Sequence, residues 1–168
     1  ELEVWYQPKL ELCNGRVVGA EALLRWRDPV RGLIPPVDFI PLAERTGLII
    51  PIGEQVLDTV CRNIVRWHDT GMLCGRIAIN VAALQIERTD FVDTLRQALN
   101  LHQLPAGSLE IEITESLLME NPEHARAVLS DIQRLGVTTA IDDFGTGYSS
   151  LSYLKLLPIN NLKIDRAF

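Results

Sequence analysis

The feature that most constrains the fold is an alternation of apolar strand-like segments and amphipathic helical segments. Polar residues close three of the strand-like segments at intervals of about 30 residues, the length of one βαβ unit: Asn80, Glu112 and Asp142. Such alternation indicates parallel strands covered by helices, so we predict an α/β fold. A barrel gathers strand-end residues around one centre at its C-terminal face, whereas an open sheet spreads them along a line. The pattern therefore favours a TIM-like (β/α)8 barrel.

Local signals place the individual elements. Pro8 is expected to end the first strand, with residues 10–12 as an alternative continuation of it. Asn14-Gly15 indicates a hairpin turn, and Asp90 and Asn121 occupy N-cap positions. A loop is expected between Asp28-Pro29 and Pro35-Pro36. Apolar periodicity predicts strands over 2–7, 16–25, 76–80, 108–114, 138–141 and 160–165. It predicts helices over 37–46, 51–70, 91–101, 122–135 and 149–156.

Composition narrows the class of protein. The chain has 168 residues, of which 47 % are apolar, so it is one domain or part of one with a sizeable core. A net charge of −6 argues against a nucleic-acid polymer or an anionic membrane as partner. Three cysteines without a Cys-x-x-Cys spacing indicate reduced thiols and a cytoplasmic setting. The chain begins at Glu1, and we expect it to be part of a longer protein.

Two adjacent acids, Asp142 and Asp143, follow the apolar segment 138–141 and precede Gly145 and Gly147. Neighbouring carboxylates repel each other unless a cation neutralises them, and a divalent metal is the usual solution. A polar loop after a core strand is the alternative. Asp-Phe-Gly also occurs in protein kinases, but no His-Arg-Asp loop precedes it, so we set that interpretation aside.

Further oxygen donors are expected to converge on this pair. Glu21, Asn80 and Glu112 would join the two aspartates in a site suited to Mg²⁺, Mn²⁺ or Ca²⁺ and poor for structural zinc. Lys163 would supply a cation for a water or a phosphate oxygen. The alternatives are structural ion pairs, of Glu21 with Arg25 or Arg27 and of Lys163 with an aspartate. The histidines are expected on the surface and outside the site: His68, His102 and His124.

Several motifs in order resemble those of the EAL domains, the bacterial cyclic-di-GMP phosphodiesterases. The segment Glu21–Trp26 (Glu-Ala-Leu-Leu-Arg-Trp) is similar to the family signature, and the resemblance runs through the whole chain. The other matching segments are 6–8 (Tyr-Gln-Pro), 39–44 with Gly47, 80–82 (Asn-Val-Ala), 112–116 (Glu-Ile-Thr-Glu-Ser), 142–151 and 162–165 (Leu-Lys-Ile-Asp).

The resemblance implies a role for each matching residue. Glu21, Asn80, Glu112 and Asp142 would bind one metal, and Asp142 would bridge to a second that Asp143 also holds. Lys163 would hold the attacking water, which makes Lys163, Asp143 and Glu21 the implied catalytic residues. The loop after Asp143 would be anchored by Glu115. Three residues would contact the dinucleotide: Gln7, Leu23 and Arg25.

The implied activity is metal-dependent hydrolysis of cyclic-di-GMP to linear pGpG by a metal-activated water. Two Mg²⁺ or Mn²⁺ ions are implied for the complete domain, with Ca²⁺ inhibitory. A homodimer, fusion to sensor or GGDEF domains, and a cytoplasmic location are also implied, in some cases as the cytoplasmic part of a membrane-anchored protein. The alternatives are an inactive EAL-type receptor for cyclic-di-GMP and a structural interaction domain.

The resemblance also sets an expectation about architecture. Residues 1–168 would be a single EAL domain, an eight-stranded barrel whose first strand is antiparallel to the others. The last quarter to third of the family's length, with the last strands and a further metal-binding glutamate, has no counterpart in this sequence.

Overall fold

The computed structural model describes residues 1–72, 75–145 and 155–166. The strands are β1 (Leu2–Leu10), β2 (Val17–Asp28), β3 (Gly32–Ile34), β4 (Arg76–Asn80), β5 (Leu109–Thr114), β6 (Thr138–Phe144) and β7 (Asn161–Ile164). The helices are α1 (Pro36–Thr46), α2 (Ile49–Asp69), α3 (Ala83–Ile86), α4 (Phe91–Leu101), α5 (Glu115–Glu120) and α6 (Pro122–Arg134), with one 3₁₀ turn, η1 (Ala106–Ser108).

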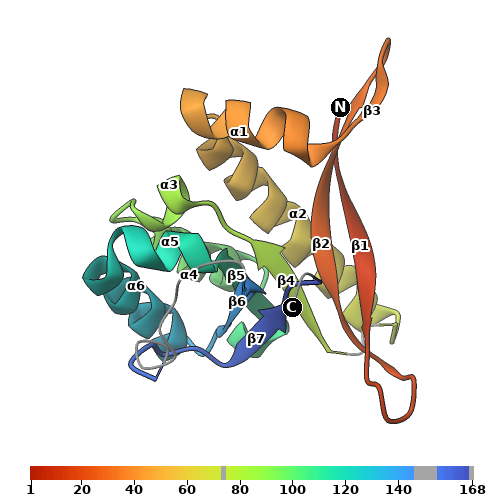
Figure 1. The fold of residues 1–168 in the computed structure, drawn as a ribbon. Coiled ribbons are helices and arrows are strands. Elements are labelled where there is room, and N and C mark those ends of the chain that lie inside the picture. Colours follow the sequence, from red (N-terminus) through yellow and green to blue (C-terminus); the bar gives the residue numbers. More distant parts are fainter. Residues whose placement is uncertain (73–74, 146–154, 167–168) are drawn as a thin grey trace.

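The described strands form one sheet in the order β1-β2-β4-β5-β6-β7, with β3 paired to β2 (Figure 1). β1 and β3 run antiparallel to β2, whereas β2, β4, β5, β6 and β7 pair in parallel. The predicted antiparallel first strand is therefore confirmed. The β2–β4, β4–β5 and β5–β6 connections contain helices, which explains their parallel pairing, because a parallel crossover needs about a dozen residues or more, usually a helix.

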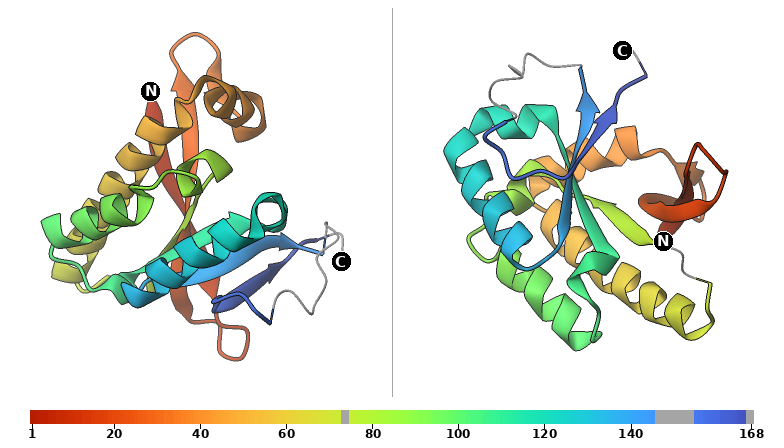
Figure 2. Two further views of the ribbon diagram at one scale, coloured as in Figure 1. Left: turned by 90° about the vertical axis from the view of Figure 1, so that its left-hand side faces the viewer. Right: turned by 90° about the horizontal axis from the view of Figure 1, so that it is seen from below.

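Helices surround the strands on one side of the curved sheet (Figure 2). The core lies between this outer face and α2, α4 and α6, whose apolar residues recur at helical spacing. Each of these helices places fully buried apolar residues in this core, as Ile64 of α2, Leu95 of α4 and Ile132 of α6 illustrate. The fold is the predicted α/β, TIM-barrel-like architecture. No helix in the described part of the chain is long and apolar enough to cross a membrane.

Register decides which residues of the parallel strands face inward. Ile77 and Ile79 of β4 pair with Leu109 and Ile111 of β5, and all four face the helices. The residues between them alternate to the inner face, since successive side chains of a strand point to opposite sides. Polar side chains on this inner face include those of Glu21, Asn80, Glu110, Glu112 and Asp142.

The structure corrects several local predictions. β1 continues through Pro8 to Leu10, because β1 lies at the end of the sheet order, where a proline nitrogen need not donate to a neighbouring strand. The predicted loop after Asp28 contains the short strand β3. Two short helices, α3 and α5, follow β4 and β5 and had no clear signal in the sequence.

The two predicted N-caps have different outcomes. The Asn121 side chain accepts a hydrogen bond from the His124 backbone N–H at 3.3 Å, which confirms that cap. Asp90 precedes α4, but its side chain makes no capping bond, because Arg88 binds its carboxylate instead. The predicted segment 149–156 extends largely outside the described residues.

Candidate metal and substrate site

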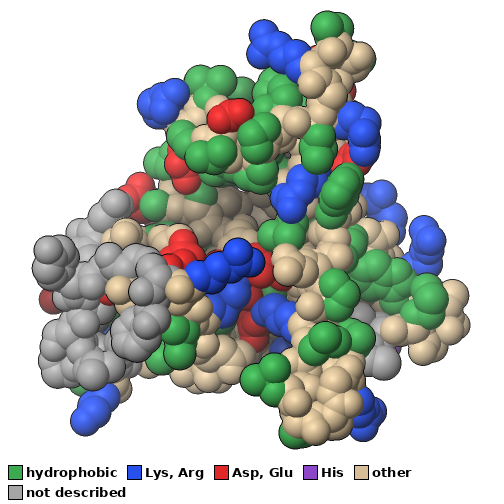
Figure 3. Space-filling view, turned by 45° about the vertical axis from the view of Figure 1, so that its right-hand side comes forward, with side chains coloured by type: hydrophobic (Ala, Val, Ile, Leu, Met, Phe, Trp, Pro, Cys, Tyr) green, Lys and Arg blue, Asp and Glu red, His purple; other side chains and the backbone are tan. Residues whose placement is uncertain are grey.

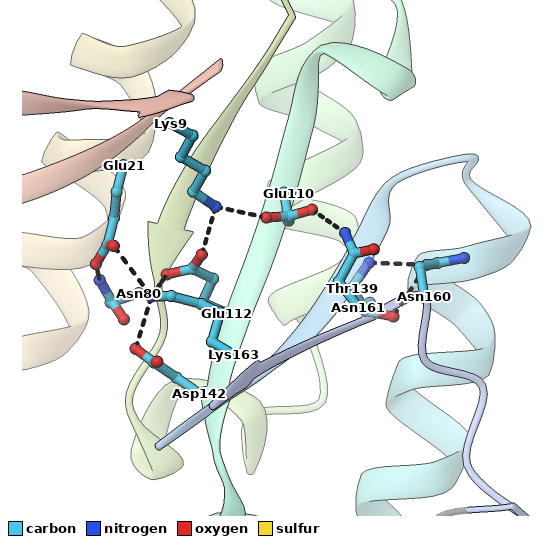
Figure 4. Close-up of polar contacts among 10 residues, drawn as sticks. All are labelled: Lys9, Glu21, Asn80, Glu110, Glu112, Thr139, Asp142, Asn160, Asn161 and Lys163. Carbon is cyan, nitrogen blue, oxygen red and sulfur yellow. Dashed lines mark hydrogen bonds and ion pairs between the residues drawn. The ribbon is translucent and has the colours of Figure 1, made fainter. Parts of the chain in front are cut away.

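Three carboxylates from three strands meet on the inner face of the sheet. Glu21 of β2, Glu112 of β5 and Asp142 of β6 each place an oxygen within 4.8 Å of the others. Asn80 of β4 pairs with Glu112 of β5, and Thr114 of β5 pairs with Asp142 of β6. The polar side chains of these neighbouring strands therefore lie near the same end of the sheet. The predicted convergence of strand-end acids is thus present in the structure (Figure 4).

The ammonium of Lys163 lies between these three carboxylates. Its Nζ donates to Glu112 Oε2 at 2.6 Å, Asp142 Oδ2 at 2.9 Å and Glu21 Oε2 at 3.0 Å. Burial alone would lower the pKa of Lys163, but the hydrogen bonds to Glu112 and Asp142 outweigh burial and raise this pKa. The position of Lys163 therefore marks where the three carboxylates stabilise positive charge.

Asn80 completes this group from the last residue of β4. Its Nδ2 donates to Glu21 Oε1 at 2.8 Å, so its amide oxygen keeps its acceptor capacity for a cation. The alternative pairing of Glu21 with Arg25 or Arg27 is wrong. Arg27 binds Glu3 at 2.8 Å, and Arg25 donates to the backbone oxygen of Leu24 at 2.9 Å.

Glu112 is the most deeply placed member of the cluster, with no exposed side-chain surface. Burial raises the pKa of Glu112, and its hydrogen bonds to Lys163 and Lys9 oppose that rise. Removing a carboxylate from water is costly unless it is paired. The two lysines provide that pairing, one at each oxygen of Glu112.

Asp143 turns away from the regular path of β6. Its φ of 53° lies in the left-handed region, and the β6–β7 register shifts between Ile141 and Phe144. The backbone at Asp143 therefore departs from the extended conformation near the end of β6. Burial and the negative charges of Asp142 and Asp165 raise the pKa of Asp143. Asp143 therefore lies beside the cluster, within the electrostatic reach of its members.

Glu115 begins α5 immediately after β5 and is buried. Its Oε2 accepts a hydrogen bond from the backbone N–H of Gly145 at 3.0 Å. This bond ties the start of α5 to the turn that leaves β6. Residues 146–150 of the glycine-rich motif lie outside the described residues.

The predicted substrate residues lie along the β1–β2 ladder. Gln7 is paired with Glu21, and Leu23 is paired with Trp5. The Arg25 guanidinium lies over the Trp5 ring, 5.7 Å from its centroid. A groove of about 280 Å³ is lined by Leu23 and Arg25 together with Asn80 and Glu112 of the cluster. Gln7 instead lines a larger hollow of about 1190 Å³ that also contains Glu21 and Lys163.

Sequence reasoning missed a second polar layer on the inner face. Lys9 of β1 binds both Glu110 and Glu112, and Asn161 of β7 donates to Glu110. Figure 3 shows acidic and basic side chains gathered in a hollow on the face of the molecule. Glu110 could have been predicted from the sequence, because it alternates with Glu112 and so lies on the same face of β5. Lys9 could not, because only the pairing of β1 with β2 brings it to these acids.

The donor set fits a hard divalent cation. Three carboxylates and an amide oxygen are the ligands that Mg²⁺ and Mn²⁺ prefer. None of the histidines belongs to the described acid cluster. His68 is exposed as predicted, whereas His102 and His124 are half-buried, bonded to Asp58 and to the backbone oxygen of Ile86.

Fold and site together define an α/β barrel-type protein with an acidic centre at the ends of its parallel strands. The EAL domain family matches residues 1–168, so the chain belongs to the EAL domain family. The chain is 49 % identical over its full length to the bifunctional diguanylate cyclase/cyclic di-GMP phosphodiesterase MucR of Pseudomonas aeruginosa, and covers 24 % of that protein. It is 43 % identical to the cyclic di-GMP phosphodiesterase PdeR of Escherichia coli, again over its full length and 25 % of the relative.

A solved structure supports the same assignment. The MucR phosphodiesterase in complex with c-di-GMP superposes with a TM-score of 0.94 at 50 % identity, over 99 % of this chain and 67 % of that one. The two curated relatives, MucR and PdeR, are larger proteins, and this chain spans about a quarter of the length of each.

Proposed function

We propose that the protein containing this chain hydrolyses cyclic-di-GMP to linear pGpG in a metal-dependent reaction. The observation that carries the proposal is the meeting of Glu21, Glu112 and Asp142 around a cationic group, beside the groove that contains Arg25. The names of the relatives MucR and PdeR, both cyclic di-GMP phosphodiesterases, support the same activity.

The metal would be held by Glu21, Asn80, Glu112 and Asp142, with Asp143 on a second ion that Asp142 bridges. We propose Mg²⁺ or Mn²⁺ as the ion and Ca²⁺ as an inhibitor. When bound, the ions supply an activated water and stabilise the negative charge that develops during phosphoryl transfer. Burial of Glu112 suits this role, because charge interactions strengthen where water is excluded.

Lys163 is assigned to hold the attacking water or a phosphate oxygen. Its Nζ donates three hydrogen bonds to carboxylates in the structure, and the same donors would hold the water or the phosphate oxygen. Arg25 would bind a phosphate, since a guanidinium presents two parallel donors to phosphate oxygens. Gln7 and Leu23 would contact the rest of the dinucleotide. Water adds to phosphorus, the bond to the 3′ oxygen breaks, and that oxygen takes up a proton to give pGpG.

Glu115 is proposed to anchor the loop after β6 through Gly145. We also propose a homodimer and fusion to sensor or GGDEF domains, since the curated relatives are larger than this chain. A cytoplasmic location follows from the proposed substrate, an intracellular messenger.

Chromatography of pGpG formed from cyclic-di-GMP tests the activity. The protein that contains this chain is expected to form pGpG with Mg²⁺ or Mn²⁺ and to form none with EDTA. If a folded protein that binds Mn²⁺ forms no product, the enzymatic proposal is wrong. Tight binding of uncleaved cyclic-di-GMP would then identify a receptor.

A further inference from the structure

Lys9 lies on β1, the first strand in the sheet order, and bridges two acids of β5. Its Nζ is 2.7 Å from Glu110 Oε1 and 2.7 Å from Glu112 Oε1 (Figure 4). These contacts join positions 101 and 103 residues apart in the sequence. Lys9 thus connects the antiparallel strand β1 to the central parallel strand of the proposed metal centre.

The two oxygens of Glu112 have different partners. Oε1 accepts from Lys9, whereas Oε2 accepts from Lys163, which also donates to Glu21 and Asp142. With Lys9 on Oε1 and Lys163 on Oε2, the two contacts together restrict rotation of the carboxylate. The Lys9 contact therefore favours the orientation in which Oε2 is presented to the centre of the cluster.

Lys9 is itself held in place by a second set of bonds. Glu110 binds Lys9 through Oε1 and accepts from the Asn161 side chain through Oε2. The inner-face neighbours of these acids in the register are the small residues Ala78 and Ala140, paired with Glu110 and Glu112 respectively. Their methyl groups leave space for long side chains to lie across β5, so the lysines of β1 and β7 reach the same strand.

We propose that Lys9 is a positioning residue for the metal centre: it orients Glu112 and balances the charge of that buried carboxylate. The inference rests on the proposed metal-dependent function. It assigns to Lys9 the role that the outer partners of metal ligands commonly have, in which they fix the direction of the ligand.

The test is the affinity of the full protein for Mn²⁺, measured without nucleotide by electron paramagnetic resonance of the free ion. Lys9→Met, which keeps the length of the apolar stem, is expected to weaken Mn²⁺ binding by roughly 10- to 100-fold, the range typical for partners of metal ligands. Lys9→Arg, which keeps a donor to both acids, is expected to recover most of the affinity.

Two further variants separate positioning from general loss of charge or stability. Arg27→Met removes a cation and an exposed ion pair from the adjoining strand β2, and Mn²⁺ affinity should stay at the wild-type value. Glu110→Gln leaves the Lys9–Glu112 contact in place, so the loss should be smaller than for Lys9→Met. If Lys9→Met does not fold, the double variant Lys9→Met/Glu110→Leu removes the pair together and is expected to show the same weakened binding.

The outcomes distinguish this inference from the proposed function. Wild-type affinity for Mn²⁺ in folded Lys9→Met, or in the double variant, would overturn the positioning role while leaving the metal centre intact. Equal losses in Lys9→Met and Arg27→Met would also overturn it. A wild-type protein that binds no Mn²⁺ would overturn the metal centre and the positioning role together.

Discussion

Charge balance on the inner face is the dominant effect at the scale of single residues. Two ammonium groups, of Lys9 and Lys163, meet the carboxylates of Glu21, Glu112 and Asp142. Breaking a buried pair by removing one partner leaves a charge uncompensated, which is more costly than removing both partners. Substitutions that preserve shape and change only charge are therefore the most informative ones here.

Asp142→Asn removes one carboxylate charge while it preserves the size of the side chain. We expect Mn²⁺ affinity to fall by at least the roughly 10- to 100-fold seen for weaker perturbations of metal sites, and turnover of cyclic-di-GMP to be lost. Calorimetry gives the affinity, and circular dichroism should show an unchanged fold. The control is Asp131→Asn on the surface of α6, which should behave as wild type. Wild-type turnover in Asp142→Asn would remove this residue from the site.

The pH dependence of metal binding should reflect Glu112. A metal binds the deprotonated carboxylate, so protons compete with it below the pKa of the ligand. Burial raises the pKa of Glu112, and competition should therefore begin above the ordinary glutamate range near about 4.3. Mn²⁺ affinity, titrated downward from about pH 8, should fall by up to about tenfold per pH unit below the raised value. An affinity that stays constant until the ordinary range is reached would contradict this assignment.

Contacts between elements fix the strands that carry these side chains. Gly19 of β2 lies opposite Arg76 of β4 at the start of their parallel pairing. A Cβ at Gly19 would lie 2.3 Å from the Arg76 backbone oxygen. The atom that it would meet belongs to the backbone and not to a flexible side chain. Glycine is required here because β2 and β4 approach closely.

Gly19→Ala should therefore destabilise the fold without touching the site chemistry. Forcing a group into a filled space costs typically about 1–3 kcal/mol, and the free energy of unfolding in urea should fall by that amount. Gly107→Ala is the matched control, because a Cβ there meets nothing within 4 Å and the unfolding free energy should change by less than about 0.5 kcal/mol. Equal effects of the two substitutions would contradict the close approach of β2 and β4.

Glu115 is the contact between α5 and the turn after β6. Glu115→Ala leaves the Gly145 N–H without this acceptor, and such a loss costs about 1–3 kcal/mol in a buried setting. We expect weaker metal affinity together with lower turnover, because the turn directly follows Asp142 and Asp143. Glu115→Gln keeps an acceptor oxygen and should retain more of both. Unchanged Mg²⁺ dependence of cleavage in Glu115→Ala would argue against the anchoring role.

At the scale of the whole molecule, the sequence predicted what depends on local patterns. Buried parallel strands and amphipathic helices have strong periodicity, and the segment 76–80 was predicted with the bounds that β4 has in the structure. The convergence of Glu112 and Asp142 followed from their places near the ends of parallel strands, whereas Glu21 lies inside the longer strand β2. Short elements such as β3 and α3 have too few residues to show a period, so their presence depends on tertiary contacts.

The inner polar layer could not be predicted because it depends on pairing between distant segments. Lys9 faces Glu110 and Glu112 only because β1 pairs antiparallel with β2 and β2 pairs with β4. Sequence position alone placed Lys9 after an expected strand end at Pro8. The sequence also could not decide whether Glu21 pairs with Arg25 or Arg27. In the structure, Arg25 donates to the Leu24 backbone oxygen and Arg27 binds Glu3.

The central claim is that the inner-face cluster is the metal centre at which cyclic-di-GMP is cut. Anomalous diffraction from crystals of the protein grown with Mn²⁺ and cyclic-di-GMP measures this directly. The account predicts a Mn²⁺ peak bounded by oxygens of Glu21, Asn80, Glu112 and Asp142, with a phosphate of the nucleotide beside it. Nucleotide bound in the groove with no Mn²⁺ peak there, and Lys163 still lying between the three carboxylates, would contradict it.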